Sequence, residues 1–272
     1  MKWIGAILRR SLPGLALLVA IGASVTAVGA TAAGEQQPSA LDTVQKSGVL
    51  RVGWAPWYPY AYRDPKNNGI GGVTVDLVNA LAARLKVKVQ WVEDGWPTMI
   101  AGLQADKFDM LMPMAITPPR AEAATFSDPF MQINLGEMVR RDDAAKYRSW
   151  HDLDKDGVSI SVAMGSNTAL YAHQVFRHAT IVEMKGEPEA VTAVITGKVT
   201  AWASTYSAFQ DSAPGRDQLV IVPGEPFAAN PLAFVVRKGD TQMQAAVNSF
   251  LAQYRASGDL ARLSARWDLQ KN

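Results

Sequence analysis

The chain has 272 residues, no cysteine and a formal net charge of +2. Without cysteine it can form neither a disulfide nor a lipid-modified amino-terminal cysteine. Lys2, Arg9 and Arg10 are three of its 27 basic residues, so the remaining chain carries 24 basic against 25 acidic residues, a net charge of −1 that does not indicate a nucleic-acid partner.

The first 32 residues have the pattern of a removable export signal. Three basic residues precede the apolar run 15–28, and residues 30–32 (Ala-Thr-Ala) are small enough for cleavage by a signal peptidase. The alternative is a membrane anchor, but the run is rich in Ala and Gly and shorter than the roughly 20 apolar residues of a spanning helix. We therefore expect residues 1–32 to be cleaved and the mature protein to be soluble in a periplasm.

Strand and helix patterns alternate in the next part of the chain. Residues 49–53, 87–91 and 108–112 are expected strands, and the last is a continuous apolar run typical of burial on both faces. Between them we expect a helix capped by Asp76 and a second helix with Pro97 in its first turn. This order of elements predicts an α/β lobe.

The same alternation returns beyond residue 140 and predicts a second α/β lobe. A final strand and two helices, separated by Gly258 as a stop signal, end the chain. The expected elements are strands at 158–162, 199–203 and 232–236, and helices after 165–167, from 188 to 197, and from about 241 and 259.

Arg120 is the first candidate for a binding residue. A guanidinium offers a rigid fork of donors that matches a carboxylate, and it keeps its charge when a cleft closes over it. Taken alone, an arginine in this context is more often a surface residue of a loop. The surrounding motifs favour the binding role.

Seven motifs occur in the order seen in family 3 periplasmic solute-binding proteins, and the chain resembles that family over residues 41–268. Each motif is weak by itself, but their order and spacing together are specific. They are 48–53 (GVLRVG), 72–77 (GVTVDL), 108–109 (FD), 117–120 (TPPR), 126–130 (FSDPF), 165–166 (GS), and 258–260 (GDL) with 266–267 (RW).

The resemblance implies a type II periplasmic binding fold, a two-lobed clamshell of two α/β domains that delivers a solute to an ATP-driven importer. The first lobe would comprise residues 41–134 and 230–272, and the second lobe residues 138–228. Two crossing strands, near 136–140 and 227–232, would form the hinge.

A cleft for a small zwitterion needs an anion clamp, a partner for the cation and apolar walls. The resemblance places Arg120 at the ligand's α-carboxylate, and Ser166 and Asn167 open a helix whose free backbone donors can face the same anion. Ordinary helix capping by Ser or Asn is the alternative for these two residues. Trp57 and Trp96 fall at the family's two aromatic wall positions, although isolated tryptophans are more often part of a core.

The chain departs from the family pattern where the ligand's ammonium is usually held. Thr205 stands where these binding proteins usually have an aspartate, and an unpaired buried ammonium is costly. Met114 and Ala115 replace the polar or Gly-flanked residues that usually precede the clamp. These changes favour a carboxylate whose amino group is methylated, cyclic or absent, unless Glu93 or Asp94 holds the ammonium.

An enzyme is the rival interpretation, because cyclohexadienyl dehydratases share the fold and family. They carry a glutamate as general acid shortly after the turn that precedes the second-lobe helix, and here that position is Thr168, which has no proton to give at neutral pH. Glu187 and Glu189 flank Pro188 at a helix start, where they are expected to complement the helix dipole. The histidines 151, 173 and 178 show neither a zinc pair nor a triad.

The sequence therefore predicts a non-enzymatic binding protein for a small carboxylate-bearing solute, an amino acid or a derivative. We expect a monomer that serves the inner-membrane permease of an ABC importer, with no cofactor and no metal. The predicted ligand-binding residues are Arg120, Trp57, Trp96, Ser166, Asn167, Thr205, Ala115 and Met114.

Overall fold

The computed structural model describes residues 38–64, 68–209 and 216–269, so the expected export signal at 1–32 lies outside the described residues. The strands are β1 (Val49–Trp54), β2 (Tyr62–Arg63), β3 (Ile70–Gly71), β4 (Lys88–Glu93), β5 (Met110–Ala115), β6 (Thr125–Phe126), β7 (Met131–Arg140), β8 (Ser159–Ala163), β9 (Thr180–Met184), β10 (Ala201–Thr205), β11 (Leu219–Ile221) and β12 (Ala228–Val236). The α-helices are α1 (Ala40–Ser47), α2 (Val73–Leu85), α3 (Met99–Gln104), α4 (Pro118–Ala123), α5 (Trp150–Leu153), α6 (Asn167–Val175), α7 (Glu187–Ile195), α8 (Thr241–Ala256) and α9 (Asp259–Arg266). Short 3-10 helices lie at Arg141–Lys146, Tyr206–Phe209 and Arg216–Gln218.

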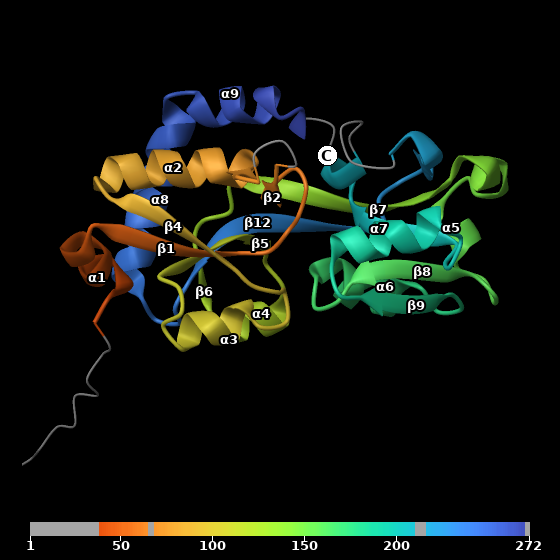
Figure 1. Cartoon of the computed structure of the whole chain (residues 1–272), viewed down its shortest axis with the longest axis horizontal. Helices are drawn as coiled ribbons and strands as arrows, with labels where there is room; N and C mark the ends of the chain where they lie inside the picture. The colour runs from red at the N-terminus through yellow and green to blue at the C-terminus, as the bar shows by residue number, and fades with distance from the viewer. Residues whose placement is uncertain (1–37, 65–67, 210–215, 270–272) are drawn as a thin grey trace, which may run out of the picture. The chain divides into compact units, whose positions relative to one another are not determined.

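One sheet runs through the described chain in the order β4-β1-β5-β12-β7-β10-β8-β9, with β11 beside β7 and β6 beside β12 (Figure 1). Strands β1, β4 and β5 are parallel to one another, and so are β8, β9 and β10. The two parallel groups lie on opposite sides of the long antiparallel strands β7 and β12. The expected fold class, a two-lobed α/β protein, is confirmed by this order and by the comparisons with solved structures reported below.

The first hydrophobic core surrounds β1, β4 and β5, and we call the elements around it lobe 1. Helix α2 packs against β4 and α8, and α1 packs against β1 and α8. The buried residues Leu77 and Leu81 lie four residues apart, so they share the face of α2 that covers the sheet. The last strand and the last two helices also contribute to this core, so lobe 1 combines the beginning and the end of the described chain.

Two expected details of lobe 1 are wrong. Helix α2 begins at Val73 rather than at Asp76, and its cap is Gly72 with φ +133°, where a Cβ would lie 2.2 Å from the carbonyl oxygen of Tyr60. Asp76 lies in the first turn instead, where a carboxylate is favoured by the helix dipole. Pro97 is not in the first turn of a helix but in the turn that precedes α3.

Lobe 2 comprises the elements around β8, β9 and β10, and it has a separate hydrophobic cluster on each face of the sheet. Helix α6 covers the face to which Leu135, Val139 and Ala203 belong. Helix α7 covers the opposite face, which carries Met138 and Trp202. This division follows from the strand pleat, because successive side chains point to opposite faces.

Strands β7 and β12 connect the two lobes. Met131–Leu135 of β7 pairs with β12, and Leu135–Val139 pairs with β10. Strand β7 contains the segment 136–140 that the sequence predicted as part of a hinge, and β12 contains all but the first residue of the other predicted segment, 227–232. The exact limits of the two lobes remain a prediction.

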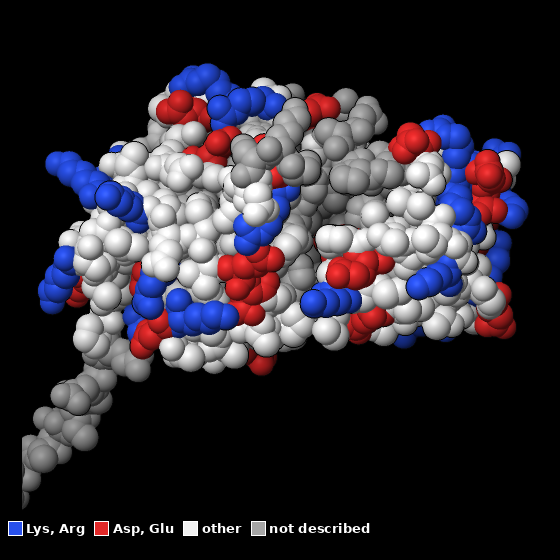
Figure 2. Space-filling view, in the orientation of Figure 1, with Lys and Arg blue, Asp and Glu red and all other residues white. Residues whose placement is uncertain are grey.

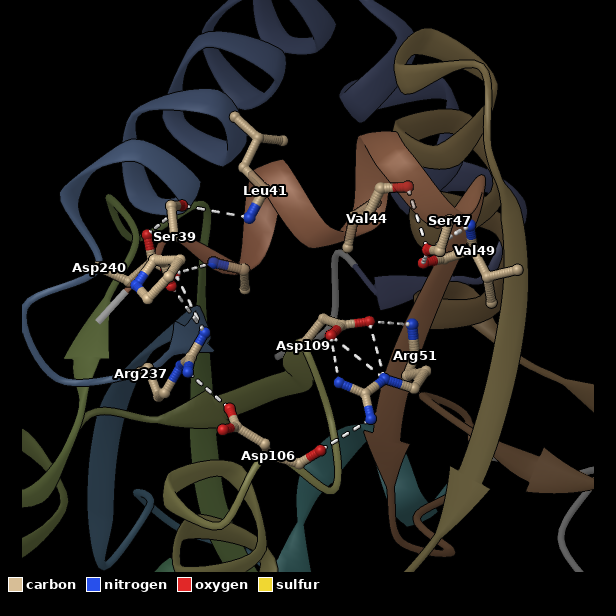
Figure 3. A network of polar contacts seen from close by, with 12 residues as sticks. Ser39, Leu41, Val44, Ser47, Val49, Arg51, Asp106, Asp109, Arg237 and Asp240 are labelled. Atoms are coloured by element: carbon tan, nitrogen blue, oxygen red, sulfur yellow. Dashed lines mark hydrogen bonds and ion pairs between the residues drawn. The ribbon is translucent and has the colours of Figure 1, made fainter.

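Charged side chains of both signs are interspersed on the face drawn in Figure 2. Some form exposed pairs, such as Arg63 with Glu93 at 2.5 Å, and water screens such pairs so that they contribute little to stability. Asp109 differs because it is only 3% exposed. Its carboxylate accepts hydrogen bonds from the backbone N of Arg51 at 2.7 Å and from the Arg51 guanidinium at 2.6 Å (Figure 3).

Asp240 ties the first described helix to the last long one (Figure 3). One of its carboxylate oxygens accepts from the hydroxyl of Ser39 at 2.6 Å, and the other accepts from the backbone N of Ala40 at 2.8 Å. The same carboxylate caps α8 by accepting from the backbone N of Met243 at 3.1 Å. A single side chain therefore accepts one amino-terminal backbone donor from each of two helices.

Candidate functional site

The predicted site residues lie at or just after the carboxyl ends of strands. Trp57 follows β1, Trp96 follows β4 and Arg120 follows β5 in lobe 1. In lobe 2, Asn167 follows β8 and Thr205 ends β10. Because the strands within each group are parallel, each group of residues gathers at one edge of its sheet, where α/β folds commonly bind ligands.

Arg120 reaches from lobe 1 to lobe 2. One terminal nitrogen of its guanidinium donates to the carbonyl oxygen of Ala115 at 3.2 Å, and the other donates to the carbonyl oxygen of Gly165 at 3.0 Å. The residue is 9% exposed, and burial lowers its pKa to about 10 while the nearby Tyr171 acts in the opposite direction. Among the described residues no carboxylate lies within ion-pair distance of this cation.

The start of α6 meets Arg120 and leaves backbone donors without acceptors. Gly165 has φ +71°, and a Cβ there would lie 2.9 Å from the ring of Pro97, so glycine allows the two lobes to approach. The hydroxyl of Ser166 caps the helix by accepting from the backbone N of Ala169 at 3.0 Å. The backbone N–H groups of Asn167 and its successor donate to no described acceptor.

Ser166 and Asn167 therefore act differently from each other. Ser166 makes an ordinary helix-capping contact, which was the alternative to its predicted role in binding the ligand. The side-chain amide of Asn167 donates to the amide oxygen of Asn230 on β12 at 3.0 Å, and both residues are buried. This bond joins the start of α6 to a strand that connects the lobes.

Trp96 lies beside the Arg120 guanidinium. The Cζ atom of Arg120 is 5.8 Å from the centre of the Trp96 ring, which is within the range of a cation-π contact. The edge of Trp96 meets Trp57 at a centroid distance of 5.7 Å. Its indole Nε1 is buried and has no hydrogen-bond partner among the described residues. We call Arg120, Trp96 and the start of α6 the Arg120 side of the site.

Thr205 belongs to a chain of hydrogen bonds that crosses between the lobes. Trp57 donates from Nε1 to Oγ1 of Thr205 at 3.3 Å, and Trp57 stacks on Tyr60 at a centroid distance of 3.8 Å. The hydroxyl of Ser207 lies 3.2 Å from both the Thr205 hydroxyl and the Tyr60 hydroxyl. We call Trp57, Tyr60, Thr205 and Ser207 the Thr205 side of the site.

Met114 and Ala115 are buried in β5, where they pair with β12. Ala115 contributes its carbonyl oxygen to Arg120, a role that the side chain alone does not reveal. Its Cβ and the Met114 side chain are apolar, so this part of the site offers no further polar side-chain group. The roles of these residues in binding stay predictions.

The two carboxylates proposed as alternative partners for an ammonium have partners of their own. Glu93 pairs with Arg63, and Asp94 accepts from Lys107 at 2.7 Å and from Thr98. Both pairs lie at least partly in solvent. Neither carboxylate contacts a residue of the Thr205 side.

Two carboxyl groups of lobe 2, the buried Glu137 and the half-buried Glu187, have raised pKa values. Burial raises the pKa of Glu187 to about 7, although hydrogen bonds from Ser204 and Trp202 act in the opposite direction. Burial raises the pKa of Glu137 to about 8, and its Oε1 has no hydrogen-bond partner among the described residues. Glu137 pairs with Ala203 on β10, two residues from Thr205, so both side chains lie on the α6 face.

Sequence reasoning missed Tyr60, Ser207 and Glu137. Tyr60 and Ser207 each lie within three residues of a predicted site residue, and their hydroxyls could have been considered as partners. Glu137 carries no signal except its position within the apolar stretch 135–139 of β7. Gly165 was expected to precede the helix, but its carbonyl contact with Arg120 was not.

The sequence profile for bacterial extracellular solute-binding proteins, family 3, matches residues 50–270. The chain belongs to this family. It is 25% identical over 236 residues to a probable amino-acid ABC transporter periplasmic-binding protein of Sinorhizobium fredii, covering 82% of this chain and 78% of the relative. It is also 25% identical over 241 residues to the cyclohexadienyl dehydratase of Pseudomonas aeruginosa, covering 88% and 89%.

Solved structures show the same fold. The ancestral amino acid-binding protein AncCDT-1, described as a precursor of cyclohexadienyl dehydratase, matches with a TM-score of 0.78 and 34% identity over 84% of this chain and 99% of its own. A putative ABC transporter binding component of Wolinella succinogenes, complexed with lysine, matches with a TM-score of 0.74 and 29% identity over 81% and 95%. Binding proteins and an enzyme are thus both among the similar proteins, and the site must distinguish them.

Two properties of the described residues bear on other classes of function. No group of three or more histidine, cysteine, aspartate or glutamate side chains there could hold a metal ion. None of the helices that the structure describes is both long enough and apolar enough to cross a bilayer.

Proposed function

We propose that this family 3 solute-binding protein is a non-enzymatic, periplasmic component of an ABC importer and captures a carboxylate-bearing solute between its lobes. The observation that carries the proposal is the buried guanidinium of Arg120, which contacts both lobes and has no acidic partner among the described residues. Burial of an unpaired charge is unfavourable by several kcal/mol. A ligand carboxylate supplies the missing partner and is held by a matching fork of donors.

The neighbouring groups support the same assignment. The unpaired backbone donors at the start of α6 can bind the second side of a carboxylate, where the helix dipole adds to the attraction. Trp96 and Trp57 provide apolar walls, and Met114 and Ala115 continue this surface along β5. A solute with a carboxylate and a small apolar or aromatic body fits these groups, and amino acids and their derivatives are the first class to test.

The named relatives support the transport role. They include the amino-acid ABC transporter periplasmic-binding protein and an L-cystine-binding protein of Bacillus subtilis, 25% identical over 270 residues. We propose that the protein works as a monomer and passes its solute to an inner-membrane permease. Separation by size combined with light scattering, with and without solute, tests the monomer.

A dehydratase is the second candidate, because one relative is a cyclohexadienyl dehydratase and the ancestral amino acid-binding protein is described as a precursor of that enzyme. Thr168 is buried at the start of α6 and its hydroxyl cannot act as a general acid at neutral pH. The carboxyl of Glu187 has a suitable pKa, but it is held by Trp202 and Ser204 on the α7 face. We therefore expect purified protein to form no aromatic product from prephenate or arogenate. Turnover by the wild-type protein that is lost in Glu187→Gln would show instead that the protein is an enzyme.

A thermal-shift screen of the mature protein tests the binding function. At a hundredfold excess over its Kd a ligand stabilises the folded state by about 2.7 kcal/mol, so a true solute raises Tm by several degrees. The panel should contain amino acids, N-methylated amino acids, and hydroxy and simple carboxylic acids. The shift should disappear in Arg120→Ala and persist in Arg148→Ala, which removes an exposed arginine. An equal shift in both variants would contradict the proposed site.

A further inference from the structure

The charge balance at the contact between the lobes restricts the class of solute. Arg120 brings one buried positive charge, and among the described residues no carboxylate offsets it. A zwitterion has no net charge, so its binding leaves the enclosed site with the same excess positive charge. A carboxylate without an ammonium group makes the site neutral, and this arrangement carries the smaller desolvation penalty.

The polar groups opposite Arg120 are already bonded to one another. The hydroxyl of Thr205 accepts the indole N–H of Trp57, and the hydroxyl of Ser207 lies within hydrogen-bond distance of both Thr205 and Tyr60. Thr205 is 1% exposed. The indole N–H of Trp57 therefore already uses one of the two acceptor lone pairs of the Thr205 hydroxyl, and the Ser207 hydroxyl lies within hydrogen-bond distance of the same oxygen, so a ligand ammonium would have to displace one of them.

The carboxyl groups considered as partners for a ligand ammonium, in place of Thr205, are either bonded to other groups or surrounded by apolar residues. Glu93, Asp94 and Glu187 are bonded to other groups, as given above. Glu137 shares a sheet face with Thr205, but its strand neighbours Leu135, Val139 and Ala203 are all apolar. To pair with an ammonium, this carboxyl would have to ionise in surroundings that favour its neutral form.

The Arg120 side has the opposite imbalance, since it holds donors that lack acceptors. Nε1 of Trp96 is buried without a partner, and two backbone N–H groups at the start of α6 donate to no described acceptor. Buried donors of this kind are stabilised by oxygen atoms and not by a further donor such as an ammonium. A hydroxyl or carbonyl oxygen beside the carboxylate can satisfy Trp96.

We propose that the solute is a carboxylic acid with an oxygen substituent, a hydroxyl or a carbonyl, in the place of a charged amino group. This inference rests on the proposed function, because it assumes that Arg120 holds the carboxylate. It assigns the selectivity to the Trp57–Thr205–Ser207–Tyr60 hydrogen bonds and to the unpaired donor of Trp96.

Matched pairs of ligands that differ only at the amino group test this inference. Phenylalanine is compared with 3-phenyllactate, leucine with 2-hydroxy-4-methylpentanoate, and methionine with its 2-hydroxy analogue, each by calorimetric titration of the full mature chain at pH 7. In at least one pair the hydroxy acid should bind at least tenfold more tightly than the amino acid, and tenfold corresponds to about 1.4 kcal/mol. Arg120→Ala should abolish this binding.

Variants of the Thr205 side complete the experiment. Thr205→Asp should reverse the preference in that pair, because it adds a carboxylate for the ammonium, whereas the uncharged control Thr205→Val should not reverse it. Glu137→Gln should leave the preference unchanged. Loss of the preference for the hydroxy acid in Glu137→Gln would show that Glu137 recognises the ligand. It would overturn the assignment of selectivity to the Thr205 side.

The outcomes separate the inference from the proposed function. Tighter binding of the amino acid in every pair, with loss in Arg120→Ala, would overturn the inference and leave the proposed function standing. Binding of both classes that Arg120→Ala does not weaken would overturn the proposed site and the inference together. Absence of binding by every member of all three pairs would also contradict both.

Discussion

On the Arg120 side of the site, a buried guanidinium and the indole N–H of Trp96 have no anionic or accepting side-chain partner among the described residues. On the Thr205 side, Trp57, Thr205, Ser207 and Tyr60 lie in one chain of hydrogen bonds. Both sides are buried and both join the lobes. On the first side donors lack acceptors, whereas on the second side the polar groups are bonded to one another, and for this reason we propose that recognition and closure use different residues.

The largest expected effect comes from removing the charge on the Arg120 side. Arg120→Ala should weaken solute binding by roughly 2 to 5 kcal/mol, because a carboxylate is then buried without a partner. The same change should not lower Tm of the free protein, since it removes a buried cation that has no counter-ion. Calorimetric titration and thermal unfolding measure the two quantities.

Arg120→Lys refines this prediction. It retains the charge but replaces the planar fork with a single ammonium, so we expect an intermediate loss of affinity. Equal affinity in Arg120→Lys and wild type would show that charge alone is recognised. Affinity within threefold of wild type in Arg120→Ala would remove Arg120 from the site.

The next effect concerns the carboxyl that lies closest to Thr205 along the sheet. The pKa of Glu137 is raised from 4.5 to about 8 by burial, so its contribution to stability is fully present below pH 4.5 and is lost as the pH rises through about 8. Glu137→Gln should therefore be more stable than wild type at pH 9 by roughly 1 to 3 kcal/mol, and the difference should diminish towards pH 5.

Denaturant unfolding at several pH values measures this difference. Glu189→Gln, at an exposed position of α7, is the matched control and should follow the wild-type pH profile. A stability difference between Glu137→Gln and wild type that does not change with pH would show that Glu137 does not titrate in this range.

The smallest effects come from a pair of matched tryptophan changes. Trp57→Phe breaks the bond to Thr205 and should lower the free energy of unfolding by about 1 kcal/mol. Trp96→Phe removes a donor that has no partner among the described residues, so it should lower stability less than Trp57→Phe does, but it should weaken binding of a solute that supplies an oxygen by about 1 kcal/mol. Equal losses of stability in the two variants, from denaturant unfolding, would contradict the contrast between the two sides.

Much of the fold could be predicted because its signals are local. Alternation at 158–162 corresponds to β8 (Ser159–Ala163), and the apolar run at 108–112 corresponds to the first part of β5 (Met110–Ala115). The start of α2 could not be predicted from Asp76, because the close approach of the Tyr60 carbonyl to Gly72 decides it. That contact depends on the path of the loop before β2.

The site could be predicted only in part. Strand ends and motif spacing were sufficient to select Trp57, Arg120 and Thr205, and the structure places Trp57 and Thr205 in hydrogen-bond contact. The sequence could not show that Trp57 is the partner of Thr205, because 148 residues separate them. It also could not show that Arg120 has no acidic partner among the described residues, since this depends on the packing of both lobes. The ligand-binding role of each residue stays a prediction.

The Asp240 contacts have a consequence for the order in which the chain can fold. Helix α1 has only eight residues, too few for a stable helix in isolation. Ser39 caps it locally, but the backbone N of Ala40 donates to a side chain that follows 200 residues later. A ribosome therefore releases α1 long before this contact can form, whereas the strands of lobe 2 follow one another closely. During synthesis lobe 2 can form first, and lobe 1 remains open until the last helices have emerged.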